Sequence, residues 1–169
     1  MCTLAYLWQM QLVFDDNGFL VPNQPLAVDL PTMEQVFVEA FPESQTRQRL
    51  FVHFLRYLEG FKSRVSRRFT AWVNGSYVTH RVNPKDLDFV VFLDYKVYEA
   101  QEPFLDKFWS FSLEAEGLDA YLVKEYPAGH ALHARTIEDK ALWLSLYQKT
   151  KWSEDNTFYA KGFLELTFS

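Results

Sequence analysis

The sequence has 169 residues, which suits one domain, and 49% of them are apolar, which is enough for a buried core and excludes a disordered chain. The formal net charge of −5 and the isoelectric point of about 5.4 exclude a globally basic nucleic-acid-binding protein. The single cysteine, Cys2, can form no internal disulfide, and no apolar run reaches the roughly 18 residues of a membrane span, so we expect a cytoplasmic protein with no membrane anchor.

The first third of the chain predicts a hairpin and two helices. Two apolar runs flank Asp16-Asn17-Gly18, which favours a tight turn, so we predict a hairpin over residues 12–22. After a proline-rich extended crossing, the capping-box pattern that begins at Thr32 predicts a short helix to about residue 41. Ser44 can cap a longer helix to about residue 65, because apolar residues recur there at helical spacing. The polar face of this longer helix is predicted to carry Arg47, Arg49, Arg56 and Lys62.

The rest of the chain alternates between strands and helices. We predict strands over residues 69–73, 87–93, 119–123 and 163–168, and helices over residues 97–112 and 136–149. The stretch 87–93 is an almost unbroken apolar run, as in a strand that is buried on both faces. With no repeat or linker in the sequence, we expect a single domain over residues 1–169, of the α+β (α/β) class, with helices packed on a mixed sheet.

The first candidate for chemistry is Gly75-Ser76, directly after a predicted strand. Glycine lets the backbone approach a phosphate closely, and the serine adds a hydroxyl and an N–H at a turn where an anion can bind. An ordinary strand-to-turn Gly-Ser explains the same pattern.

The second candidate is the Asp86-Leu87-Asp88 sequence that opens the apolar strand. In an extended chain, residues i and i+2 point to the same face, so both carboxylates can converge on Mg²⁺ ions. Two acids that lie in solvent just before the strand are the alternative interpretation.

The third candidate is Asp119, at the start of a later strand. If that strand pairs beside residues 87–93, the carboxylate of Asp119 becomes a third ligand, or the base that receives the proton of an acceptor hydroxyl. A solvated turn acid is the alternative.

A basic cluster, Lys62, Arg64, Arg67 and Arg68, could also hold RNA or an acidic partner, or form a solvated helix end.

The ordered combination is more specific than its parts. Residues 72–94 read WVNGSYVTHRVNPKDLDFVVFLD, and this stretch resembles the polymerase-β-type nucleotidyltransferase superfamily, especially its small bacterial members in toxin–antitoxin and defence modules. The N-terminal hairpin and the Lys161-Gly162 end are also similar to that group. The resemblance implies the nucleotidyltransferase fold.

The resemblance also implies residue roles. Triphosphate binding falls to Gly75 and Ser76, with Lys85 either touching a phosphate or lying in solvent. Two Mg²⁺ ions, or Mn²⁺ in their place, would be held by the catalytic carboxylates Asp86, Asp88 and Asp119.

The implied reaction moves a nucleoside monophosphate from a nucleoside triphosphate onto a macromolecular acceptor. ATP is the default donor because it is abundant. The implied acceptor is a tyrosine hydroxyl on a partner protein of a toxin–antitoxin pair, or a tRNA end, and the acidic composition favours the protein. The alternatives are a non-catalytic antitoxin that acts by binding its partner, and a toxin that adds nucleotides to tRNA. Larger members carry a further helical domain, for which little chain remains after residue 123, so base and acceptor choice stay open.

Overall fold

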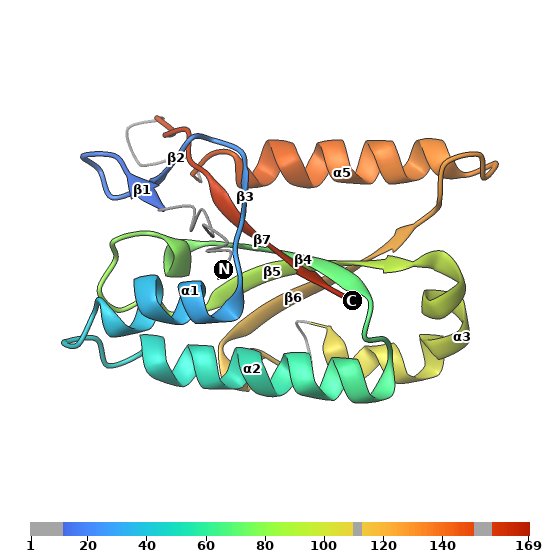
Figure 1. The fold of residues 1–169 in the computed structure, drawn as a ribbon, viewed down its shortest axis with the longest axis horizontal. Coiled ribbons are helices and arrows are strands. Elements are labelled where there is room, and N and C mark those ends of the chain that lie inside the picture. Colours follow the sequence, from blue (N-terminus) through green and yellow to red (C-terminus); the bar gives the residue numbers. More distant parts are fainter. Residues whose placement is uncertain (1–11, 110–112, 151–156) are drawn as a thin grey trace, which may run out of the picture.

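A five-stranded mixed sheet lies between helices on its two faces (Figure 1). The structure is a computed structural model that describes residues 12–109, 113–150 and 157–169. The strand order is β3-β7-β4-β5-β6, in which β3 pairs with β7 and β5 with β6 in parallel, while β4 is antiparallel to both β7 and β5. The strands are β3 (Pro25–Ala27), β4 (Phe69–Asn74), β5 (Leu87–Asp94), β6 (Leu118–Glu125) and β7 (Phe163–Phe168). This arrangement confirms the predicted mixed α+β class.

The helices divide between the two faces of the sheet, with α5 (His133–Tyr147) as the helix on one side in Figure 1. The opposite side is covered by α1 (Leu30–Glu34), its π-helical continuation η1 (Gln35–Glu39), α2 (Arg47–Arg64) and α3 (Tyr95–Leu105). Three short 3-10 turns lie in the connections: η2 (Ser76–Val78), η3 (Asp106–Phe108) and η4 (Glu114–Glu116). Within the described ranges, no helix is both long and apolar enough to cross a bilayer.

The predicted elements are found with shifted ends. The hairpin is confirmed as β1 (Val13–Phe14) and β2 (Leu20–Val21). The first helix begins at Leu30 and not at Thr32, because the carboxylate of Asp29 caps it by accepting the Thr32 N–H at 2.9 Å. The helix predicted over residues 97–112 ends at Leu105 and passes into η3, and residues 110–112 lie outside the described ranges.

The apolar run of residues 87–93 forms the central strand β5, whose two faces pack in different clusters. Phe89, Val91 and Leu93 belong to the large core under α2 and α3, whereas Val90 and Phe92 belong to a smaller aromatic cluster under α5. Both faces of β5 are therefore buried, as the unbroken pattern predicted. The smaller cluster also contains Trp72, Tyr147 and Phe163.

Arg47 is fully buried, which corrects its predicted place on the polar face of α2. Its guanidinium donates to the carbonyls of Phe37, Tyr77, Thr79 and Arg81 at 3.1, 2.7, 2.6 and 2.5 Å, and it lies 4.0 Å from the ring centroid of Phe41. These carbonyls come from irregular or short helical segments, of which Thr79 forms an isolated bridge with Phe19, and the guanidinium supplies the hydrogen-bond donors for them. Burial lowers the pKa of Arg47 to about 10, which leaves it protonated at neutral pH. Arg47 thus ties α2 to the segment that follows Gly75.

Candidate active site

Two of the predicted carboxylates lie side by side at the amino ends of parallel strands. Asp88 on β5 is the register partner of Asp119 on β6, and on its other side Asp88 is paired with Asn74 on β4. Neighbouring strands run about 4.8 Å apart, and register partners point to the same face. This is the face covered by α5, because Trp72 and Val90, two residues further along, belong to the aromatic cluster beneath that helix. Both acids are partly buried.

Gly75 lies directly against the carboxylate of Asp88. Its backbone has φ 76° and ψ −162°, a region that glycine alone tolerates well. A Cβ placed on Gly75 would lie 1.6 Å from Oδ2 of Asp88. The bare glycine therefore makes room for the acid, and the turn opens into η2 with Ser76, which is partly buried.

Gly75→Ala is expected to lower the free energy of unfolding by about 1–3 kcal/mol and to push the Asp88 carboxylate out of place, because strain and overlap act together. Gly129→Ala is the matched control, since Gly129 has φ 86° but nothing within 4 Å of an added Cβ. Urea unfolding measures the stability of each variant. The affinity for Mn²⁺, followed by electron paramagnetic resonance, reports whether the Asp88 carboxylate still binds a metal ion. Equal losses in the two variants would contradict the overlap with Asp88.

Lys161 completes this corner of the site from the residue pair just before β7. Only 5% of it is exposed, and its ammonium donates to Oδ1 of Asn74 and, at 3.3 Å, to the carbonyl of Gly75. Burial lowers the pKa of Lys161 to about 8, and the negative charge of Asp88 opposes that shift. Lys161 thus fixes the backbone of the glycine turn and supplies positive charge beside the acids. In the sequence, Lys161 stands out only as part of the resemblance, which implies no role for it.

Lys161 is expected to make stability increase with pH. Above pH 8 the folded chain has released a proton that the unfolded lysine, with its pKa of 10.5, still binds, so the free energy of unfolding rises between these values. Relative to Lys161→Met, the wild-type protein should gain about 2 kcal/mol between pH 7.5 and 9.5 in metal-free buffer. Urea titrations of both proteins across this range provide the measurement, and parallel curves would count against a depressed lysine pKa.

Tyr147, near the end of α5, faces the same acids. It is 6% exposed, and its hydroxyl is buried without a hydrogen-bond partner among the described residues. Burial raises the pKa of Tyr147 well above its usual value, and Asp88, Asp119 and Tyr121 raise it further, so the hydroxyl is a neutral donor at physiological pH. An unsatisfied buried donor beside two carboxylates is costly unless a ligand or water accepts from it.

The other predicted residues lie at the rim. Asp86 precedes β5 by one residue and is exposed, and Lys85 is exposed with no ion pair in the described ranges. No group of three or more His, Cys, Asp or Glu side chains among the described residues is close enough to hold one metal ion. The structure therefore brings together Asp88, Asp119 and Gly75, and places Asp86 and Lys85 outside this group.

Comparison with known proteins gives one result. A family model described as "Family of unknown function (DUF6932)" matches residues 12–167, nearly the whole chain. Searches of the curated proteins and of the solved structures found no match.

Proposed function

We propose that this chain, a member of the DUF6932 family of unknown function, is a metal-dependent nucleotidyltransferase. The observation that carries the proposal is the parallel register of Asp88 and Asp119 on β5 and β6, with Gly75 against the first acid. Two carboxylates held on adjacent rigid strands beside a glycine turn can bind a cation and a phosphate chain at one place.

The donor set fits Mg²⁺. This ion prefers oxygen ligands, and it is commonly held by one or two carboxylates, with waters and substrate phosphates filling the other positions. Asp88 and Asp119 would supply the protein ligands, with waters and phosphate oxygens in the other positions, and the exposed Asp86 lies outside this pair. When bound, Mg²⁺ neutralises the charge that develops on the phosphoryl oxygens.

The residues of this chain would then orient the reactants. The Gly75–Ser76 turn would cradle the triphosphate, and the Tyr147 hydroxyl would donate to a phosphate oxygen or to water. In the reaction, an acceptor hydroxyl oxygen bonds to the α-phosphorus while the bond from this phosphorus to the bridging oxygen breaks, so pyrophosphate leaves. The proton of the hydroxyl passes to a carboxylate, for which Asp119 is the candidate.

The donor and the acceptor belong to the proposal as well. ATP is the default donor, and a hydroxyl on a partner protein in a toxin–antitoxin or defence module is the preferred acceptor, because the chain carries a net charge of −5 that disfavours RNA. A tRNA end is the competing acceptor.

The test is transfer of label. The pure protein is incubated with Mg²⁺ and each α-³²P nucleoside triphosphate, with total tRNA in one series and the product of the adjacent gene in another. We expect label on one acceptor with Mg²⁺ and none with EDTA. Titration of Mn²⁺ and a non-hydrolysable ATP analogue provides a readout that needs no acceptor. Absence of both binding and transfer would overturn the proposal.

A further inference from the structure

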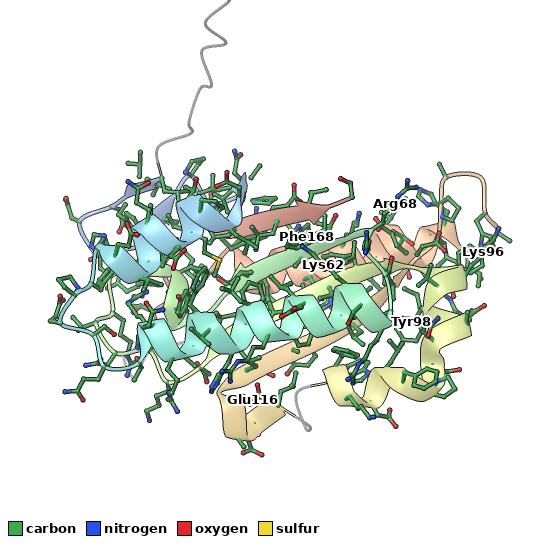
Figure 2. All side chains as sticks on the ribbon, turned by 60° about the horizontal axis from the view of Figure 1, so that its bottom comes forward. Lys62, Arg68, Lys96, Tyr98, Glu116 and Phe168 are labelled. Carbon is green, nitrogen blue, oxygen red and sulfur yellow. The ribbon has the colours of Figure 1, made fainter. Side chains whose placement is uncertain are left out.

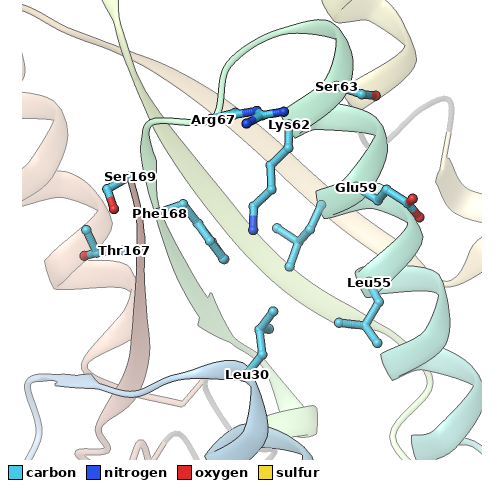
Figure 3. A pocket seen from close by; sticks show the side chains of 10 residues that line it. Leu30, Leu55, Glu59, Lys62, Ser63, Arg67, Thr167, Phe168 and Ser169 are labelled. Atoms are coloured by element: carbon cyan, nitrogen blue, oxygen red, sulfur yellow. The ribbon is translucent and has the colours of Figure 1, made fainter.

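A second feature lies on the opposite face of the sheet from Asp88. There α2, the start of α1 and the end of β7 enclose an open hollow of about 630 Å³ (Figure 3). We call it the α2 groove; its apolar lining includes Leu30, Leu55 and Phe168, and its charged lining is made by Lys62, Arg67 and Glu59. Its volume falls in the range of binding sites, and it touches none of the candidate catalytic residues.

The groove combines an apolar floor with cations that have no acidic partner. The Lys62 ammonium lies 4.0 Å from the ring centroid of Phe168, and the two side chains lie beside each other in Figures 2 and 3. The salt bridges in the described ranges are Lys124–Glu99 and Lys140–Glu125, so neither Lys62 nor Arg67 takes part in one. A carboxylate could pair with both cations without displacing a resident partner.

The local charge contrasts with that of the whole molecule. Residues 62–68 read KSRVSRR, which contains four basic residues and no acidic one, in a chain whose formal net charge is −5. Arg67 and Arg68 are exposed, and of the two Arg67 lines the groove. Of the charged side chains that line the groove, Lys62 and Arg67 are basic and Glu59 is acidic, so the lining keeps a net positive charge that attracts anionic groups.

We propose that the α2 groove binds an acidic, amphipathic segment of a partner protein. Apolar side chains of that segment contact the partly exposed Leu30 and Leu55, while its carboxylates pair with Lys62 and Arg67. Peptides that bind in grooves commonly use such spaced apolar anchors with charged flanks. RNA fits less well, because the floor is mainly aliphatic and the one aromatic ring is already covered by the Lys62 ammonium. This binding is separate from the proposed transfer reaction.

Selection from a phage-displayed library of random 12-residue peptides, with the full chain immobilised, tests the proposal. We expect the enriched peptides to combine Asp or Glu with Leu, Ile or Phe. Synthetic peptides of the enriched sequences should bind Lys62→Glu and Arg67→Glu at least tenfold more weakly by fluorescence anisotropy. They should bind Arg49→Glu, changed on the first turn of the same helix, and Asp88→Asn as they bind the wild type.

Several results would overturn the groove as an acidic-peptide site. These are failure to enrich any peptide, enrichment of peptides without acidic residues, and equal binding by Arg67→Glu. Arg67 is exposed in a loop, so this variant keeps the test valid even if Lys62→Glu unfolds. A fluorescein-labelled single-stranded RNA that binds more tightly than the peptides, and is released by the same substitutions, would also overturn it. Asp88→Asn changes a candidate catalytic carboxylate and leaves the α2 groove intact. Peptide binding by this variant therefore tests the groove separately from the nucleotidyltransferase proposal.

Discussion

Asp88→Asn is expected to lower the rate of nucleotide transfer by about 10³-fold, because it removes one of the two charges that the sheet holds together. Asparagine has nearly the same shape, so it keeps contact with Gly75 but cannot neutralise a cation. The initial rate of label transfer from the α-³²P nucleotide, at saturating acceptor, measures the loss. Mn²⁺ titration of the same variant should show weaker binding.

Asp16→Asn is the control for this change, since Asp16 is exposed in the hairpin turn, and the same chemical change there should leave the rate unaltered. Urea unfolding of both variants separates loss of chemistry from loss of fold. A transfer rate for Asp88→Asn within threefold of the wild type would show that the paired carboxylates do not carry the reaction.

Arg47→Met is expected to lower the free energy of unfolding by about 3–5 kcal/mol, the largest effect on stability that we expect from one side chain. Methionine fills much of the volume but leaves the carbonyls of Phe37, Tyr77, Thr79 and Arg81 without their donor inside the protein. Three of these carbonyls, those of Tyr77, Thr79 and Arg81, belong to the segment after Ser76, so nucleotide binding should weaken as well. The urea midpoint and the slope of the transition give the stability change.

Arg49→Met changes the same residue type two positions along α2, where the side chain is exposed, and should alter stability by less than about 0.5 kcal/mol. Arg47→Lys should fall between the two, because a lysine keeps the charge but lacks the planar fork. A loss of under about 1 kcal/mol in Arg47→Met would mean that water or a rearranged backbone satisfies the four carbonyls.

Local pattern was sufficient to predict most of the strands, whereas the pairing of Asp88 with Asp119 stayed conditional on their strands being neighbours. The Asp86-Leu87-Asp88 alternation predicts that these two carboxylates share a face but not which face it is, and Asp119 lies next to Asp88 because β6 is the neighbour of β5. The capping residue of α1 was wrong, because Asp29 competes with Thr32 for the same turn and lies nearer the observed start. Such choices between nearby caps depend on how the chain enters the helix.

Buried polar residues could not be predicted in this way. Arg47 falls in a helix rich in arginine, and its burial depends on carbonyls as far away as Arg81. Lys161 contacts Asn74 and Gly75 across more than eighty positions, and Tyr147 meets the acids only because α5 crosses their face of the sheet. The Lys161-Gly162 pair just before an apolar strand, which also takes part in the resemblance, was the signal in the sequence that could have pointed to Lys161. β3, with its proline, was predicted only as extended chain, since its parallel partner β7 is distant in sequence.

The position of β7 has a consequence for synthesis of the chain. This strand comes last in sequence order but lies inside the sheet, between β3 and β4. Before it is added, β3 has no partner in the sheet, and β4 presents an unpaired edge of backbone donors and acceptors. Nascent chains and prematurely terminated products that lack residues 163–168 are therefore expected to aggregate or to be degraded, and not to persist as partly active fragments.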